Sequence, residues 1–419
     1  MKGGKRMWQH PWRYKESIAI VAGFILVGLM LQLTIGNFNF TLLQSPVNLI
    51  LGGFILLLLL IFALFRRSLL YKWFSGVPMA VTLIAALAVL GIIMGLTPQL
   101  TDNSEANTSI PSRFGFDRMT SSWSFVLVYL LTLLSLGALI VRRLITFRKK
   151  DYAFYLNHIG LWVLLFFSGL GAADMRRYVM HIRETETEWR VYNDTGDILE
   201  LPIAIELNDF YMEEYPPSLA IIDRKTSAVQ PDDKPYLYQI DEKRPQADIG
   251  KWQLTLKEYI HEAVRNSDST YREVFMPGAA PAAKVEVINT ETGVAKEGWV
   301  CFGNMSQLYM TLNLDTAYCV AMTKADPKRF VSDINVYTED GKKGHALLEV
   351  NKPYKLGSWM LYQYDYDDLA GKMSTYSSIE LVYDPWIIPV YIGISLLALG
   401  SICMLWAGNR RKEVSDDVE

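Results

Sequence analysis

The sequence predicts a polytopic α-helical membrane protein with six transmembrane helices and a large extracytoplasmic, mostly-β domain. Of its 419 residues, 51% are hydrophobic and 20% are charged, whereas a soluble protein of ordinary composition has about 25% charged residues. Six blocks contain no Asp, Glu, Lys or Arg: 17–36, 47–65, 77–97, 122–141, 152–173 and 386–407. One long charged insert, 174–383, separates the last two blocks. This pattern excludes a soluble enzyme, a disordered chain and a nucleic-acid binder with a basic face.

Each of the six blocks is long enough to span a membrane as a helix. The hydrocarbon layer is roughly 30 Å thick, and a helix rises about 1.5 Å per residue, so about 20 apolar residues cross it. The first block, 17–36, is predicted to stay as a span rather than to be removed as a signal peptide. It is longer than the apolar core of a signal peptide, and no clear small-x-small cleavage site follows it.

The positions of lysine and arginine predict the orientation, because short loops rich in these residues stay in the cytoplasm. Basic residues gather before the first block, after the second, after the fourth and after the sixth: Lys2 to Lys15, Arg66 to Lys72, Arg142 to Lys150 and Arg410 to Lys412. The intervening loops, 37–46 and 98–121, lack this excess. We therefore expect both termini in the cytoplasm and the 174–383 insert outside. The insert has 34 acidic and 23 basic residues, a net charge of −11.

The insert reads as mostly β-structure in one compact domain. Alternating, β-branched and aromatic segments occur at 202–211, 252–260, 284–289 and 308–314. Asp340-Gly341 lies between 334–338 and 345–350, which predicts a hairpin with a loop longer than two residues. The alternating glutamates of 184–188 are typical of one exposed face of a strand. Trp386, just before the last block, is expected at the outer membrane interface.

The three cysteines limit the redox chemistry that this chain can perform. Cys301 and Cys319 lie in the insert and form a possible disulfide in an oxidising compartment. The alternative is two buried thiols, and the two stay open because spacing alone fixes no connectivity. Cys403 lies in the last block and is expected to pack there. No Cys-x-x-Cys occurs, which argues against a thiol oxidoreductase and against covalent haem attachment to this chain.

Only one histidine falls inside a predicted span. His158 lies seven residues into 152–173, about 10 Å from the cytoplasmic end at 1.5 Å per residue. Because desolvating an imidazole without a partner costs several kcal/mol, ionisable groups in a membrane usually face a partner, a cavity or a cofactor. Three interpretations stay open: a histidine bonded to a neighbouring helix, a proton relay, and an axial ligand of haem iron. A single histidine fills one axial position, so a second ligand would come from another chain.

Other constellations in the sequence are weak. Asp365, Asp367 and Asp368 lack the glycine and the terminal glutamate of a calcium loop, so solvated turn residues are the favoured interpretation. No nucleophile elbow, phosphate loop or metalloprotease pair occurs. No catalytic residue is therefore assigned.

Several segments, taken together and in order, resemble the ResB (CcsB) family of cytochrome c maturation proteins. These segments are 77–100, 121–143 (SSWSFVLVYLLTLLSLGALIVRR), 156–171 (LNHIGLWVLLFFSGLG), 207–222 (LNDFYMEEYPPSLAII), 350–364 (VNKPYKLGSWMLYQY) and 384–401 (DPWIIPVYIGISLLALGS). The resemblance covers about 77–407. It departs from the family pattern in having five spans before the insert rather than three, and the tryptophan-rich segment of the partner family, ResC (CcsA), is absent.

The resemblance implies four regions. Residues 1–76 form a cytoplasmic arm plus two extra transmembrane helices, and 77–173 form three ResB-like helices. Residues 174–383 form the extracytoplasmic mostly-β domain, and 384–419 form the last helix and a cytoplasmic tail. The implied location is the bacterial inner (cytoplasmic) membrane.

The resemblance also implies a function in cytochrome c-type biogenesis. Haem b would bind transiently and without covalent attachment, with His158 as one axial ligand and a histidine of a ResC/CcsA-like, tryptophan-rich partner as the other. The complex would take haem across the membrane and present it for attachment to apocytochrome c. This favours an accessory subunit of a cytochrome c synthetase (haem lyase) over a catalyst acting alone.

Two functions of other classes compete with this one. The chain is alternatively a membrane-anchored receptor or scaffold whose β domain binds a ligand and which holds no cofactor. A small-molecule transporter ranks last, because transporters use broken helices with internal polar groups and these spans contain few polar side chains.

Overall fold

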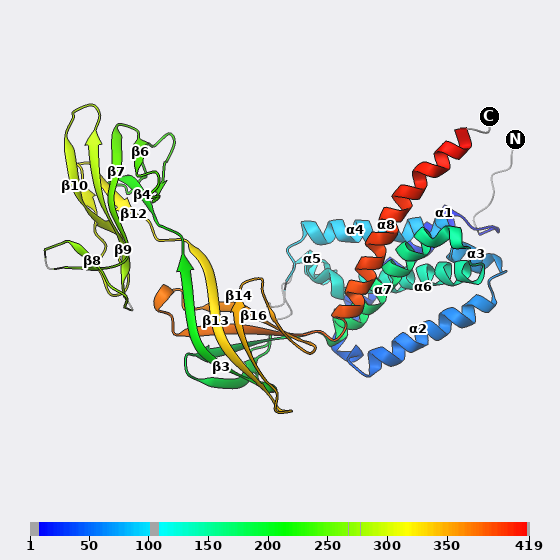
Figure 1. The fold of residues 1–419 in the computed structure, drawn as a ribbon. Helices are drawn as coiled ribbons and strands as arrows, with labels where there is room; N and C mark the ends of the chain where they lie inside the picture. The colour runs from blue at the N-terminus through cyan, green and yellow to red at the C-terminus, as the bar shows by residue number, and fades with distance from the viewer. Residues whose placement is uncertain (1–7, 101–108, 267, 277, 417–419) are drawn as a thin grey trace.

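A computed structural model describes residues 8–100, 109–266, 268–276 and 278–416, with the backbone alone over 407–416. The molecule is elongated (Figure 1): a helical bundle forms one end, a first β lobe adjoins it, and a second β lobe lies beyond the first. The predicted fold class is confirmed, because six long apolar helices suited to spanning a membrane accompany a large β region.

Six long helices form the bundle. They are α1 (Tyr14–Ile35), α2 (Val47–Leu64), α4 (Val77–Leu96), α6 (Trp123–Ile145), α7 (Tyr152–Asp174) and α8 (Ile387–Asp416). The helices reproduce the six uncharged blocks closely; only α8 extends well past its block. Short helical turns that the sequence analysis did not anticipate lie in the connections: η1 (Phe40–Leu43), α3 (Leu69–Phe74), α5 (Ile110–Arg113), η2 (Phe116–Ser121) and η3 (Lys149–Asp151).

Side chains of the bundle donate hydrogen bonds to backbone carbonyls of neighbouring helices. These bonds run from Ser124 Oγ to Ile25 at 3.0 Å, from Tyr71 OH to Ala138 at 2.8 Å, from Ser135 Oγ to Phe74 at 2.7 Å and from Trp162 Nε1 to Leu133 at 3.1 Å. Lipid is as apolar as the helix surfaces, so packing and such hydrogen bonds hold transmembrane helices together. The buried hydroxyl and indole groups thereby gain partners that lipid cannot supply.

Both connections to the β region leave the same end of the bundle (Figure 1). The strand β1 (Arg176–Arg183) starts directly after α7, and β17 (Tyr376–Tyr383) ends directly before α8. These two strands pair antiparallel along their whole length, from Arg176 opposite Tyr383 to Arg183 opposite Tyr376. The start of α1 and the last turns of α8 lie at the opposite end of the bundle.

The β lobe next to the bundle is an antiparallel sheet of eight strands that nearly closes into a barrel. Besides β1 and β17, its strands are β2 (Thr187–Tyr192), β3 (Ile198–Glu214), β13 (Pro327–Thr338), β14 (Lys343–Glu349), β15 (Tyr354–Leu356) and β16 (Trp359–Tyr366). Their order is β14-β13-β3-β2-β1-β17-β16-β15. Ile205, Leu207, Ile334, Leu361 and Ile379 are fully buried in its core. We call this the proximal lobe.

The second lobe, the distal lobe, is inserted between β3 and β13. Its strands are β4 (Ser218–Asp223), β5 (Tyr238–Gln239), β6 (Gln246–Ile249), β7 (Trp252–Arg265), β8 (Tyr271–Glu273), β9 (Ala280–Asn289), β10 (Ala295–Cys301), β11 (Leu312–Asn313) and β12 (Tyr318–Met322). They form two sheets, β10-β9-β7-β6, with β8 beside β7, and β11-β12-β4-β5. Ile221 and Val320 of one sheet share a core with Leu254 and Val285 of the other.

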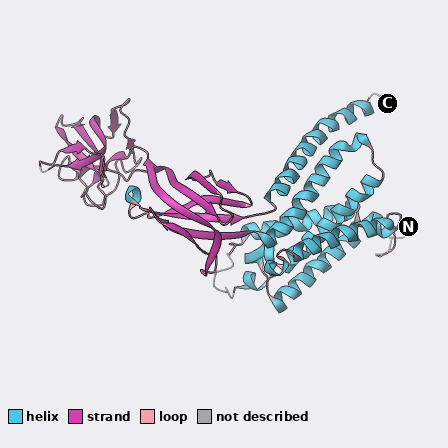
Figure 2. Ribbon diagram, turned by 60° about the horizontal axis from the view of Figure 1, so that its bottom comes forward, coloured by secondary structure: helices cyan, strands magenta, loops and turns pink. Residues whose placement is uncertain are grey.

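The β insert therefore contains two lobes with separate cores, a division that the sequence analysis did not anticipate. Both lobes lie on the same side of the helices and consist mostly of strands (Figure 2). Two chain segments join the lobes, where Tyr215 N donates to Asp326 O at 2.9 Å and Thr323 N donates to Ser218 O at 2.8 Å. Lys372, in η4 (Gly371–Met373), lies 3.5 Å from Glu214 and 3.9 Å from Glu262.

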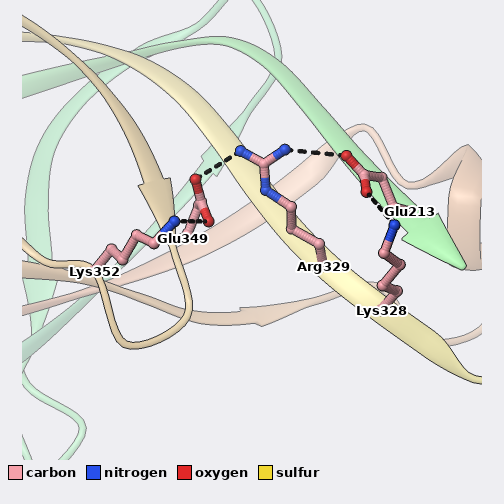
Figure 3. Close-up of polar contacts among 5 residues, drawn as sticks. All are labelled: Glu213, Lys328, Arg329, Glu349 and Lys352. Carbon is pink, nitrogen blue, oxygen red and sulfur yellow. Dashed lines mark hydrogen bonds and ion pairs between the residues drawn. The ribbon is translucent and has the colours of Figure 1, made fainter.

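An ion-pair network crosses three strands of the proximal lobe near this junction (Figure 3). The guanidinium of Arg329 on β13 lies between Glu213 of β3, at 3.0 Å, and Glu349 of β14, at 2.6 Å. Lys328 pairs with Glu213 at 3.4 Å, and Lys352 pairs with Glu349 at 2.9 Å. Hydrogen bonds from Arg329 and Lys352 lower the pKa of Glu349 to about 2. The network joins β3 and β13, whose ends lead to the distal lobe, and also joins β13 to β14.

Some predictions for individual strands are confirmed and others are wrong. The hairpin around Gly341 is confirmed, since β13 ends at Thr338 and β14 begins at Lys343. The segment 308–314 contributes only the two-residue strand β11. The prediction for 184–188 is largely wrong: these residues form the turn between β1 and β2, with Thr185 at φ +65°, and only the last two belong to β2. Alternation of charged residues does not distinguish a strand from an exposed turn.

Candidate functional site

His158 lies in the second turn of α7, where the sequence places it. Its ring is half-buried, and its Nδ1 lies 3.1 Å from the carbonyl oxygen of Phe154, one turn earlier. The imidazole stacks on the Phe154 ring with the centroids 3.9 Å apart and the planes at 27°. The guanidinium of Arg143 also lies over the Phe154 ring, 5.3 Å from its centroid. An aromatic ring and a backbone carbonyl together fix the orientation of the imidazole.

The contact with Phe154 determines which ring nitrogen of His158 is available. A carbonyl oxygen only accepts hydrogen bonds, so the contact at Nδ1 requires the proton there. The lone pair of a neutral ring is then on Nε2. No hydrogen-bond partner of Nε2 occurs among the described residues. A metal-ligating histidine has the same arrangement, in which one nitrogen donates to a backbone carbonyl and the other binds the metal.

The helix that presents His158 is held against α8 by very close packing. A Cβ built on Gly393 of α8 would lie 2.6 Å from the backbone nitrogen of Leu164, and one built on Gly160 of α7 would lie 2.8 Å from the carbonyl carbon of Leu396. Residues other than glycine are therefore excluded at these two positions. Asn157 Nδ2 donates to Ser401 Oγ at 2.8 Å on the same interface. Figure 1 shows α7 and α8 side by side from their common end.

His158 itself lies on another face of α7. Residues four apart share a helix face, and Trp162, one turn further on, donates to the Leu133 carbonyl of α6. Tyr129 of α6 also donates its hydroxyl to the carbonyl of Leu165. The face that carries His158 is thus directed toward α6, away from the α8 contact. This leaves α8 free to fix the helix while the imidazole faces elsewhere.

The donor set around His158 fits one axial ligand and no more. The described residues contain no group of three or more His, Cys, Asp or Glu side chains that could hold a metal ion. A closed metal site made by this chain is therefore not formed in the described part of the protein. A single neutral imidazole suits haem iron, provided that a second ligand comes from another chain.

The other histidines are engaged locally. His181 Nδ1 lies 2.9 Å from Ser378 Oγ and also contacts the hydroxyl of Tyr376. His345 Nε2 lies 2.7 Å from Asp333 Oδ1 across the β13–β14 hairpin. His261 Nδ1 lies 3.2 Å from the Tyr259 hydroxyl, and His10 stacks on the Trp12 ring. Each of the four histidines therefore has a local contact with a neighbouring side chain.

The cysteines of the insert are free thiols in the structure. Cys301 on β10 and Cys319 on β12 are both buried, and the possible disulfide between them is not formed. The backbone N–H of Gly303 donates to Cys301 Sγ at 3.3 Å. Burial raises the pKa of the Cys301 thiol. Cys403 is a half-buried free thiol on α8.

The acidic residues of 365–368 serve local turns. Asp367 Oδ1 accepts from the backbone N–H groups of Leu369 and Ala370, at 3.0 and 3.2 Å. Asp365 Oδ1 accepts from the N–H of Tyr366. This arrangement agrees with solvated turn residues.

Sequence reasoning missed the role of Asp174, which it placed at the start of the charged insert. Asp174 is the last residue of α7, is only 6% exposed, and joins three helices. Its carboxylate accepts from Ser45 N at 2.8 Å, from Asn48 Nδ2 at 2.7 Å and from Trp386 Nε1 at 2.7 Å. A lone aspartate between an apolar block and two arginines was the available signal. Trp386, expected at the membrane interface, lies at this boundary between helices and proximal lobe.

Comparison with known proteins supplies no family assignment: no protein-family model matches the chain, and neither does any curated protein. The ResB-like segments fall on regular elements of the fold. The segment 156–171 lies within α7, 207–222 spans β3 and β4, and 350–364 spans β15 and most of β16. Membership of the ResB family stays a proposal.

Proposed function

We propose that this chain is the haem-handling subunit of a membrane cytochrome c maturation complex. It works with a ResC/CcsA-like partner, which supplies the second haem ligand and the surface on which haem is attached to apocytochrome c. The observation that carries the proposal is the imidazole of His158. It is half-buried in a transmembrane helix, oriented through Nδ1, and has Nε2 without a partner among the described residues.

The geometry supports a role for each group in this proposal. The Phe154 carbonyl holds the proton on Nδ1, and the Phe154 ring limits rotation of the imidazole, so Nε2 is presented in one orientation. Arg143, whose guanidinium lies over the Phe154 ring, places a positive charge near the site that suits an anionic propionate. Haem, when bound, supplies the iron and the vinyl groups that react with the thiols of the apocytochrome. The protein chain binds and orients it.

The orientation that we propose places the basic ends of the helices in the cytoplasm and both β lobes outside, in the bacterial inner membrane. Arg66, Arg67, Lys72, Arg142 and Arg143 all lie at the end of the bundle opposite the lobes, as the preference of basic loops for the cytoplasm requires. His158 lies near that end of α7. Haem synthesised inside would reach it without crossing the membrane first.

The test compares two histidine variants in membranes that contain the ResC/CcsA-like partner. His158→Ala is expected to lose most of the haem Soret absorbance while the protein accumulates at the normal level by immunoblot. His345→Ala is the matched control, since it removes an exposed imidazole of the proximal lobe that pairs with Asp333, and it should keep the Soret band. An unchanged band in His158→Ala overturns the proposal.

A membrane-anchored receptor or scaffold is the second candidate. A groove of about 740 Å³ on the proximal lobe favours it, lined by Trp189, Glu200, Leu201, Pro202, Ile203, Ala204, Tyr337, Thr338 and Glu339. A receptor needs no haem, so purified chain and partner would be colourless when haem is plentiful. Loss of function in Trp189→Ala together with full function in His158→Ala would select this alternative.

A further inference from the structure

An apolar cavity that opens onto the surface of the bundle lies between α2, α3 and α6, at the end of the bundle away from the β lobes. Its volume is about 390 Å³, within the range of about 300–1,000 Å³ that is usual for ligand pockets. Every lining residue is apolar: Phe54, Leu57, Leu58, Leu59, Ile61, Phe62, Phe65, Leu70, Phe74 and Leu134. The helix α2 belongs to the two spans that the ResB resemblance does not account for. The cavity is thus a feature of the added part of the chain.

Four cations lie on, or directly after, the elements that line this cavity. Arg66 and Arg67 directly follow the lining residue Phe65, Lys72 lies on α3, and Arg142 lies on α6. Arg142 Nη1 donates to the backbone carbonyl of Lys72 at 3.3 Å, which joins α6 to α3.

Arg66 and Arg142 both lie in the surroundings of Tyr71. The ring of Tyr71 packs against the lining residue Phe62, with the centroids 4.8 Å apart. None of the four cations forms an ion pair with a carboxylate in the described part of the chain. Their charge is available to a ligand.

Orientation in the membrane explains the cations but not the cavity. Basic residues after a transmembrane helix are expected at any cytoplasmic end, and they also complement the negative end of the α2 dipole. Neither effect requires an apolar cavity beside them. A ligand with a long apolar tail and an anionic head would fit both the apolar cavity and the cations.

We propose that this cavity binds one molecule of an anionic phospholipid. One acyl chain occupies the apolar space between α2 and α6, and the phosphate lies against Arg66 and Arg142. Guanidinium groups form paired hydrogen bonds with phosphate oxygens, and basic pockets between transmembrane helices bind acidic head groups. The inference is independent of haem binding, because His158 does not line the cavity.

Native mass spectrometry of the full chain in detergent tests the proposal. The chain is incubated with phosphatidylglycerol or with phosphatidylcholine of the same acyl chains, and the fraction that retains one lipid is measured. We expect a clear preference for phosphatidylglycerol in the wild type. Removing one cation should reduce that preference about fivefold, so Arg66→Gln with Arg142→Gln should nearly abolish it.

Two matched controls separate a site from general attraction. Arg148→Gln with Lys150→Gln removes two cations at the same end of the bundle that do not adjoin the cavity, and it should keep the preference. Leu57→Trp fills the cavity and should block retention of either lipid. Leu60→Trp adds the same ring to α2 at a position that does not line the cavity and is 62% exposed, so it should bind lipid as the wild type does.

Three outcomes overturn the proposal. The first is equal retention of both lipids by the wild type, and the second is an equal loss in both double-charge variants. The third is displacement of the lipid by added haemin together with loss of haemin binding in Leu57→Trp, which would make the cavity a porphyrin site. Size-exclusion profiles and thermal unfolding midpoints of all variants verify that each chain is folded.

Discussion

The carboxylate of Asp174 accepts a hydrogen bond from the indole Nε1 of Trp386 at 2.7 Å. Asp174 is the last residue of α7, and Trp386 immediately precedes α8, so the bond joins the two helices at the point where the chain leaves and re-enters the bundle. The same carboxylate accepts from Ser45 and Asn48 at the start of α2. One side chain thus joins the ends of α7, α2 and α8 next to the two connections to the β region.

Replacing Asp174 should destabilise the helical bundle. Asp174→Ala leaves the N–H of Ser45, the amide of Asn48 and the indole of Trp386 without their acceptor, and a lost buried acceptor costs about 1–3 kcal/mol. We expect a clearly lower unfolding midpoint in detergent by differential scanning fluorimetry. Trp386→Phe removes one of the three bonds and should have a smaller effect. Asp248→Ala, at an exposed position of β6, is the control; an equal change there would contradict the role of Asp174.

The α7–α8 contact should not tolerate a methyl group at Gly400. A Cβ there would lie 2.6 Å from Asn157 Cα, a backbone atom that cannot move aside. We expect Gly400→Ala to cost about 1–3 kcal/mol by overpacking and to reduce the amount of folded protein in the membrane. Gly91→Ala on α4 is the matched control, because a Cβ there meets nothing within 4 Å. The two variants should differ in unfolding midpoint, and equal midpoints would show that the helices are farther apart than described.

The ion-pair network around Arg329 should make the proximal lobe less stable in acid. The pKa of Glu349 is lowered to about 2 from its usual 4.5, and the pKa of Glu213 is lowered as well, chiefly by its hydrogen bond with Arg329. A carboxylate with a lowered pKa in the folded state stabilises that state above the unfolded pKa. The stabilisation is lost as the pH falls from about 4.5 toward 2.

Arg329→Gln tests this pH dependence. The variant should unfold at a lower denaturant concentration than the wild type at pH 7, and the difference should shrink below pH 4.5. Circular dichroism of the β-structure in the full chain follows the transition at each pH. Lys243→Gln, at an exposed cation without an ion pair among the described residues, should leave the curve unchanged. A difference that stays constant from pH 7 to pH 2.5 would argue against the network as its source.

The number of reactive thiols should differ between the folded and the unfolded protein. Cys301 and Cys319 are buried and free, and burial raises the pKa of each. A thiol with a raised pKa has little reactive thiolate at pH 8. We therefore expect neither to react with a maleimide in the native chain, and all three cysteines to react after denaturation without a reductant. Only one reactive thiol under those conditions would mean that Cys301 and Cys319 are joined.

The membrane part of this fold was predictable because lipid permits few backbone structures in a spanning segment. A segment in hydrocarbon must satisfy every backbone group within itself, and so an uncharged block of sufficient length becomes a helix. The start of α7 at Tyr152 puts His158 on the seventh residue of the helix, where its sequence position placed it. The β region was predictable in kind but not in arrangement. Alternation identified β3, β7 and β9 and misassigned most of 184–188, since it does not report which strands pair or where a chain turns.

The sequence by itself determined six spans, a β-rich insert and one ionisable side chain within the membrane, because these depend on local composition and helix length. Tertiary structure alone decided that the insert is two lobes, that Asp174 joins three helices and that an apolar cavity lies beside Arg66 and Arg142. These features bring together residues far apart in the chain, such as Ser45 with Asp174 and Leu134 with Phe54. Only packing in three dimensions selects such partners, because many alternative partners are chemically equivalent in the sequence.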